Sequence, residues 1–325
     1  MLLAYFFSTH QIIVLLLITL IPPTFLSSQA NEIVTSETTD ITNTNDQRQS
    51  EPPDKIGEPP EDDISHLFVR ESEVLLAPRE VQIIFGVSYS SEEDYSNLRK
   101  ARDRTFSFPL VVSIGITNDL ESYISIPFVY TESEYTSFGE GEKNENSGLG
   151  DISLGFSHRL LPETLEYPSI TVSFKVQVPT DDNNDTDTSE SPATSSGYWG
   201  VSSSISFTRS IDPAIMFFSF GLNYQFEDEK YGLDLRPGNT YFYSFGTGLS
   251  INSAISLSGR VSGSYSEELE VNGQKRVGSN NEPVSLVLTS IYRINKKLSL
   301  ETFVDFGLNE DANSTSFGFN YIYNL

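Results

Sequence analysis

The side chains of this sequence that could do chemistry are a few charged residues set among alternating apolar and small residues. We expect seven of them to point into one shared interior: Asp151, Arg159, Lys175, Arg260, Arg293, Glu301 and Asp305. Charges that line a narrow pore can select ions. Buried charges must also be paired, because desolvating a single one costs several kcal/mol. These residues therefore predict either an ion filter or a set of braces inside the fold, and bracing is the simpler interpretation.

A catalytic site finds little support in the residue types. The chain has no cysteine, which excludes thiol chemistry and thiolate metal sites. Of its three histidines only His158 lies in the patterned part of the chain, with Ser157 on the opposite face of a strand, so no Ser–His pair forms; the others are His10 and His66. Glu301 and Asp305 could act as paired carboxylates, yet four residues along one strand separate them by about 13 Å. We therefore predict no enzyme, no cofactor and no metal site.

The charge balance restricts the partners. The chain has 45 Asp and Glu against 20 Lys and Arg, a net charge of -25, which argues against nucleic acid because phosphate neutralisation needs a basic surface. The acids gather in four stretches: 132–145, 181–190, 227–234 and 267–270. Oxygen-rich loops can hold calcium, but none of these places a ligand at every second position with the required glycine. We therefore interpret them as solvated, mutually repelling loops.

The elements that must position these residues are strands. From residue 81 to 325 apolar side chains recur at every second position, so each strand has an apolar face and a polar or small face. In 214–226, for example, Phe218 and Phe220 share one face. The pattern predicts twelve strands: 81–90, 104–117, 121–132, 149–161, 168–179, 197–210, 213–226, 240–251, 254–266, 283–294, 298–308 and 314–325.

The connections between the predicted strands alternate in length. They are tight after strands two, six, eight and ten and modest after four, whereas those after one, three, five, seven and nine are long, polar and mostly acidic. Short periplasmic turns, longer extracellular loops and an even strand number are typical of outer-membrane barrels. We therefore predict an all-β, up-and-down antiparallel transmembrane β-barrel of about 12 strands. The rival is a soluble β-sandwich or lipocalin-type barrel, which would need far more charge on its small-residue face.

The residues before the first strand form two predicted segments. An apolar run at 12–21, followed by two prolines and small residues up to Ala30, indicates a secretory signal peptide over 1–30, although no Lys or Arg precedes the run. A transmembrane anchor is the alternative, but a bilayer span needs roughly twenty residues. Residues 31–75 are acidic and contain prolines, which predicts a disordered periplasmic extension, and 76–325 then form the barrel.

Three short stretches of the barrel region resemble those of a known family. Residues 148–155 (GLGDISLG) look like its glycine-glycine-aspartate strand opening, and 212–214 (DPA) look like one of its turns. Residues 174–180 (FKVQVPT) resemble its apolar strand ending in Pro-Thr, although Asp181 stands where the family usually has Gly. Over most of 75–325 the chain is thus similar to the outer-membrane barrel family labelled as the MetA pathway of phenol degradation or as outer-membrane transporters. The resemblance implies a barrel that passes small, often hydrophobic compounds.

The function that these observations favour is a passive channel or transporter for small, hydrophobic solutes in the outer membrane of a Gram-negative-type bacterium. Two alternatives stay open: a non-conducting structural or surface-interaction barrel, and a membrane-embedded hydrolase. The last strand carries aromatic residues at alternate positions, as expected of the signal that barrel-insertion machinery reads. The expected partners are therefore this machinery, outer-membrane lipid and lipopolysaccharide, and a small-molecule solute.

Overall fold

The structure is a computed structural model that describes residues 75–96, 99–137, 140–180, 192–230, 232–312 and 315–325. All of these residues belong to one compact unit, Pro53–Leu325. The predicted signal peptide and, except for Leu75, the predicted extension lie outside the described residues, as does the acidic stretch 181–190. Among the described residues no helix is long and apolar enough to cross a membrane.

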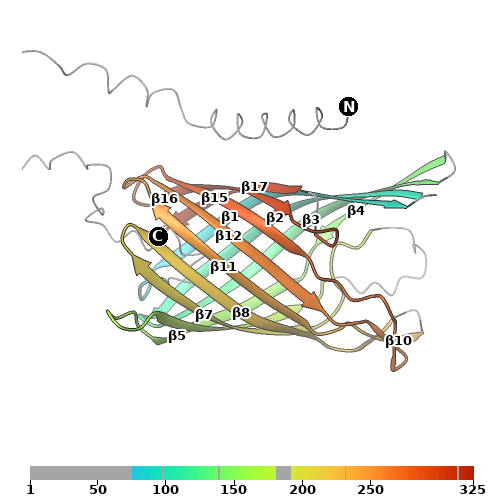
Figure 1. The fold of residues 1–325 in the computed structure, drawn as a ribbon, viewed down its shortest axis with the longest axis horizontal. Coiled ribbons are helices and arrows are strands. Elements are labelled where there is room, and N and C mark those ends of the chain that lie inside the picture. Colours follow the sequence, from blue (N-terminus) through green and yellow to red (C-terminus); the bar gives the residue numbers. More distant parts are fainter. Residues whose placement is uncertain (1–74, 97–98, 138–139, 181–191, 231, 313–314) are drawn as a thin grey trace, which may run out of the picture. The chain divides into compact units, whose positions relative to one another are not determined.

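One antiparallel sheet of thirteen strands closes on itself, because β2 pairs with both β1 and β3 (Figure 1). Its strands are β1 (Val81–Ser96), β2 (Arg99–Thr117), β3 (Leu120–Ser137), β4 (Glu140–Leu149), β5 (Ile152–Leu161), β6 (Ser169–Val178), β7 (Gly200–Ile211), β8 (Ala214–Gln225), β11 (Thr240–Ser250), β12 (Ile255–Ser266), β15 (Val284–Arg293), β16 (Leu298–Gly307) and β17 (Thr315–Asn324). Residues 120–125 of β3 pair with β5 and residues 128–137 pair with β4. Since β4 and β5 share one position in the wall, the thirteen strands make a barrel of twelve positions. The predicted fold class is confirmed.

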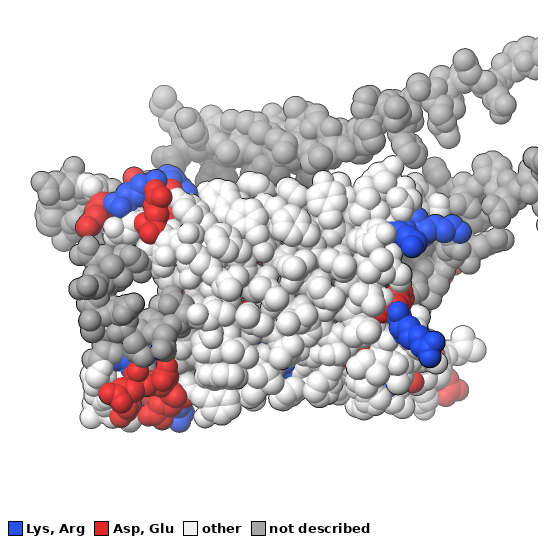
Figure 2. All heavy atoms as spheres, turned by 180° about the vertical axis from the view of Figure 1, so that it is seen from behind, with Lys and Arg blue, Asp and Glu red and all other residues white. Residues whose placement is uncertain are grey.

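The outer face of the wall is apolar, as the alternation predicts. On β8, Phe218 and Phe220 are 44% and 47% exposed, whereas the neighbouring Phe217, on the opposite face, is 3% exposed. Figure 2 shows a broad band of uncharged side chains on the face of the barrel that it draws, with charged side chains gathered at its two ends. This band is the surface that lipid would cover.

The connections at one end of the barrel are short. They span residues 118–119, 162–168, 212–213, 251–254 and 294–297. The wall both begins and ends at this same end, where Gln82 of β1 pairs with Asn324 of β17. The predicted short connections are therefore confirmed, and these turns form the periplasmic end of an outer-membrane barrel.

The connections predicted after the first and third strands are not loops, and this part of the prediction is wrong. β1, β2, β3 and β4 continue past the apolar band as paired strands that project from the barrel (Figure 1). These extensions lack an apolar face, so apolar alternation does not reveal them. Cross-strand charge pairs hold them instead: Arg104 contacts Glu132, and Lys143 Nζ lies 2.9 Å from Glu132 and 2.6 Å from Glu145.

Two acidic stretches predicted as solvated loops fold into a second, small sheet. Its strands are β9 (Asp228–Lys230), β10 (Leu233–Arg236), β13 (Glu270–Val271) and β14 (Gln274–Lys275). The β13–β14 turn has positive φ at Asn272 (50°) and Gly273 (74°), the conformation that an Asn-Gly pair favours in tight hairpins. Arg236 and Glu270 pair across the sheet, with Nη2 and Oε1 3.4 Å apart. This pair offsets part of the repulsion among the acids of the small sheet.

Candidate functional site in the barrel lumen

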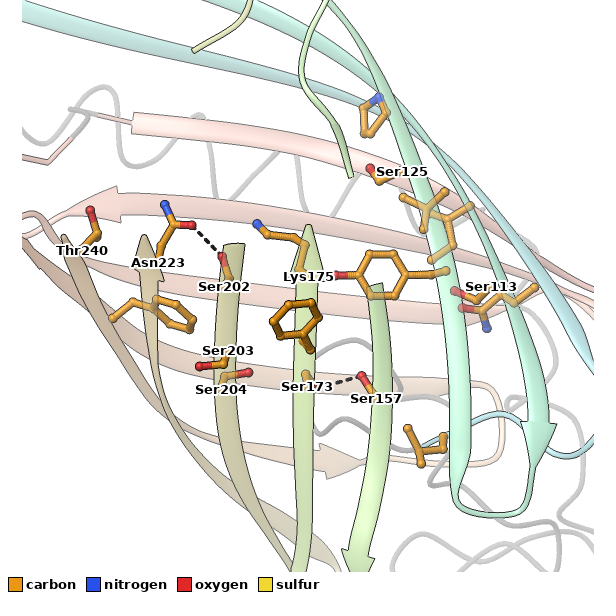
Figure 3. A pocket seen from close by; sticks show the side chains of 18 of the residues that line it. Ser113, Ser125, Ser157, Ser173, Lys175, Ser202, Ser203, Ser204, Asn223 and Thr240 are labelled. Carbon is orange, nitrogen blue, oxygen red and sulfur yellow. Dashed lines mark hydrogen bonds between the residues drawn. The ribbon is translucent and has the colours of Figure 1, made fainter. Parts of the chain in front are cut away.

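The barrel encloses a cavity of about 700 Å³. The described residues that line it come from the segment before β1 and from β1, β2, β3, β5, β6, β7, β8, β11, β12 and β17. Figure 3 shows its polar side chains, among them Lys175, Ser202 and Asn223. A volume of this size suits a small molecule.

One side of the cavity is a polar row fixed by strand register. Residues on adjacent strands that pair directly point to the same face of a sheet, so the row can be followed from strand to strand. It consists of Tyr123, Gly155, Lys175, Ser202, Asn223 and Thr240. Ser202 Oγ donates a hydrogen bond to Asn223 Oδ1 at 2.7 Å. Within this row Lys175 is the only charged residue.

Another part of the cavity is apolar. Leu75, Ile84, Pro109 and Val111 line it together. Ile84 and Leu75 are 6% and 7% exposed, so their side chains are buried inside the barrel and do not face lipid. The cavity is therefore amphipathic, with a polar row and an apolar wall.

Aromatic side chains in the lumen lie across glycines of neighbouring strands. A Cβ on Gly246 would come within 2.4 Å of the Phe217 ring, one on Gly221 within 2.2 Å of Phe242, one on Gly155 within 2.5 Å of Tyr123 and one on Gly318 within 2.8 Å of Phe303. Only glycine leaves room for an aromatic ring to lie flat against the neighbouring strand. Apolar alternation alone predicts a small and polar inner face and does not indicate these aromatic residues, although each is paired in register with a glycine.

Asp151 holds an inward-folded segment at the extracellular end of the cavity. Its Oδ2 accepts hydrogen bonds from Gln177 Nε2 at 2.8 Å and Ser196 N at 3.0 Å, and its Oδ1 accepts one from Ser195 Oγ. A Cβ on Gly150 would lie 3.2 Å from Thr194 O. The GLGD stretch thus has a structural role, since glycine gives the segment space and the carboxylate pins it.

Arg260 and Asp305 lie in one register row, separated by Val287 on β15. The two charges interact electrostatically, and Asp305 also accepts a hydrogen bond from Ser285. Arg260 Nε is buried and has no hydrogen-bond partner among the described residues. This pair lies on the lumen face of β12 and β16.

Of the seven candidates, Lys175 alone is among the described residues that line the cavity, and the last three lie elsewhere on the strands. Glu301 is 3% exposed and accepts a hydrogen bond from Asn320 Nδ2. Arg159 Nε donates to Asp119 Oδ1 at 3.0 Å near the periplasmic turns, and Arg293 lies at the same end of β15. The structure therefore brings Lys175 near Asp151 and Arg260 near Asp305, but it does not gather the seven charges into one ring.

The segment before β1 occupies the periplasmic end of the lumen. Leu76 is 1% exposed, and its backbone N donates to Glu121 Oε2 at 3.0 Å. Arg79 N donates to Gly115 O at 2.7 Å, and a Cβ on Gly115 would lie 2.0 Å from Ala77 O. Glycine is required on this strand because the segment lies directly against it, which narrows the route through the barrel.

The geometry at His158 does not form a catalytic pair. Its Nδ1 donates to the backbone oxygen of Asp119 at 2.8 Å, while Ser157 Oγ bonds with Ser173 Oγ at 2.8 Å on the lumen face. Within the described ranges no three His, Asp or Glu side chains gather as a metal site.

A closed barrel of twelve positions with a lipid-exposed apolar band defines an outer-membrane β-barrel. A family profile described as "Putative MetA-pathway of phenol degradation" matches residues 82–325, and the chain belongs to this family. Among solved structures, an outer-membrane channel from Pseudomonas putida F1 has a TM-score of 0.63 at 13% identity, over 79% of this chain and 98% of that one.

Two further solved structures are more distantly similar. The NanC porin has a TM-score of 0.45 at 9% identity, over 75% of this chain and 100% of that one. The translocator domain of the autotransporter NalP from Neisseria meningitidis has a TM-score of 0.45 at 9% identity, over 80% of this chain and 95% of that one.

Proposed function

We propose that this chain is a passive outer-membrane channel for small, hydrophobic solutes. The observation that carries the proposal is the amphipathic cavity of about 700 Å³ inside a barrel whose outer face is apolar. The family description and the channel from Pseudomonas putida F1 agree with it. Its surroundings would be outer-membrane lipid and lipopolysaccharide, reached through the barrel-insertion machinery.

The lumen surface supports hydrophobic cargo more than salts or sugars. The aromatic ring of Phe242 and the apolar wall at Ile84 and Val111 line the cavity and can contact an apolar molecule without loss of hydrogen bonds. Serine hydroxyls elsewhere in the lumen bond to one another, as in the Ser219–Ser244 pair at 2.8 Å. They are therefore already satisfied when an apolar solute displaces water.

Two measurements on the folded, heat-modifiable protein test the proposal. In planar bilayers we expect conductance steps, and Arg260→Ser should shift ion preference toward cations because it removes a lumen cation beside Asp305. Lys296→Ser, at a periplasmic turn, is the matched control and should leave the preference unchanged. In liposomes the protein should accelerate uptake of a small aromatic solute.

A folded barrel that neither conducts nor accelerates uptake would contradict the channel and favour a non-conducting surface barrel. Hydrolysis of a lipid or ester that His158→Ala abolishes would instead favour the hydrolase alternative. Each of the three functions thus predicts a different pattern of results.

A further inference from the structure

Lys175 is the charged residue among those that line the cavity. It is half-buried on the lumen face of β6. Its ammonium makes no hydrogen bond or ion pair with any residue that the structure describes. Among the described residues that line the cavity it is the only cation, and none of them is an acid. An ammonium has three donors and no acceptor, so it requires water or an anionic partner.

The carboxylate of Asp151, the opposite charge near Lys175, is already hydrogen-bonded to other residues. Asp151 interacts electrostatically with Lys175, but its two oxygens accept hydrogen bonds from Ser195, Ser196 and Gln177. It therefore lowers the cost of keeping a charged lysine in the lumen without occupying the ammonium. The donors of Lys175 stay directed at the cavity.

Neutral hydrogen-bonding groups flank the ammonium on the same row. Ser202 is its direct partner in register on β7, and Asn223 follows on β8. Because Asn223 Oδ1 accepts from Ser202, its Nδ2 group is left to donate toward the cavity. Gly155 is the partner on the other side, and the Tyr123 ring lies across it. Figure 3 shows Lys175, Ser202 and Asn223 side by side on adjacent strands.

We propose that Lys175 and the donors beside it bind the carboxylate of an amphipathic monoanion, whose apolar body contacts the wall formed by Leu75, Ile84 and Val111. The inference rests on the proposed channel function and narrows its cargo to apolar acids. A single ammonium matches a single negative charge, which favours a carboxylate over a phosphate ester. The acidic residues of the extracellular end do not prevent this, since salt screens exposed charges over about 8 Å.

Binding can be measured apart from transport. The probes are benzoate and its neutral analogue benzyl alcohol, titrated by saturation-transfer NMR against the full chain in nanodiscs. We expect benzoate to bind more tightly than benzyl alcohol. Lys175→Met should weaken benzoate by about tenfold, equivalent to about 1.4 kcal/mol, and leave benzyl alcohol unchanged. Lys175→Arg should keep most of the benzoate affinity.

Two further variants check the interpretation of the binding measurement. Asn223→Asp is nearly isosteric, keeps the acceptor for Ser202, and should also weaken benzoate by adding a negative charge to the cavity. Lys297→Met removes one charge at a periplasmic turn and should change nothing. Benzoate affinity that is equal in the wild type, Lys175→Met and Asn223→Asp would overturn the proposal. If conductance persists in that case, only the carboxylate site fails; if the barrel is silent but binding depends on Lys175, only the channel fails.

Discussion

The outer and inner faces of the same strands follow different rules. On β8, Phe218 is 44% exposed toward lipid, while its neighbour Phe217 is 3% exposed inside the lumen. Most of the outer face needs only to be apolar, because lipid covers it, although Tyr243 lies across Gly263 there. Side chains of the inner face must pack against those of neighbouring strands. Each lumen aromatic residue described above therefore lies across a glycine, as Phe217 lies across Gly246. The outer face is thus specified mainly by composition, and the packing of the inner face depends more on which residues are paired.

The largest test of this difference places the same residue on each face. Phe218→Lys puts an ammonium in the lipid band near the middle of β8, and we expect it to lower the free energy of unfolding by about 2–4 kcal/mol. Ser219→Lys faces the lumen, where polar groups rather than lipid surround the ammonium. It breaks the hydrogen bond to Ser244, and we expect a smaller loss of about 1 kcal/mol. Equilibrium urea unfolding in lipid vesicles measures both. Equal losses for the two variants would show that the faces do not differ in this way.

A smaller test compares glycines on the two faces. A Cβ on Gly246, in the lumen, would lie 2.4 Å from the Phe217 ring and 2.7 Å from Gly259 O, whereas one on Gly259, facing lipid, would meet only Leu288 at 3.5 Å. We expect Gly246→Ala to cost about 1–3 kcal/mol by overpacking. Gly259→Ala should change stability by no more than about 0.5 kcal/mol.

The same vesicle unfolding assay applies to these glycine variants. In a Phe217→Ala background, which itself loses the buried ring, Gly246→Ala should cost less than in the wild type, because only the contact with Gly259 O remains. A Gly246→Ala variant as stable as Gly259→Ala would mean that the lumen packing can shift at no cost.

The outer face explains how far the sequence could predict the fold. A period of two in apolar residues, as at Phe218 and Phe220, follows directly from lipid contact, and it was sufficient for the strand number and the periplasmic turns. The projecting parts of β3 and β4 contact no lipid. Charged residues take the place of the apolar ones there, so the stretch that contains Glu132 and Lys143 was interpreted as a loop.

The candidate site was less predictable because it depends on register. Alternation places Lys175 on the inner face, but nothing local in the sequence indicates that Ser202 and Asn223 continue its row or that Gly155 makes room for Tyr123. Those relations arise only when strands far apart in the chain pair and the sheet closes. The aromatic residues inside the lumen were missed for the same reason, since each is accommodated by a glycine on another strand.

The smallest expected effect concerns the projecting strands, where charge pairs replace the apolar face. The hydrogen bond from Lys143 is the main cause that lowers the pKa of Glu132 and of Glu145 below the ordinary range. A carboxylate with a lowered pKa stabilises the fold above its ordinary pKa and loses that contribution as pH falls through the lowered value. Lys143, whose pKa is raised mainly by its hydrogen bond to Glu145, stays charged throughout this acidic window.

We therefore expect the β3–β4 extension to open locally as the pH falls below about 4, while the barrel wall keeps its protection. The effect is small because these side chains are exposed and solvent screens them. Amide hydrogen exchange, corrected for its intrinsic pH dependence, measures it, with the amides of β8 as the internal reference. Lys143→Met removes the shared cation, so its extension should already exchange faster at neutral pH and respond less to acid. An acid response that is equal in the variant and the wild type would show that apolar contacts, not this charge cluster, hold the projecting strands.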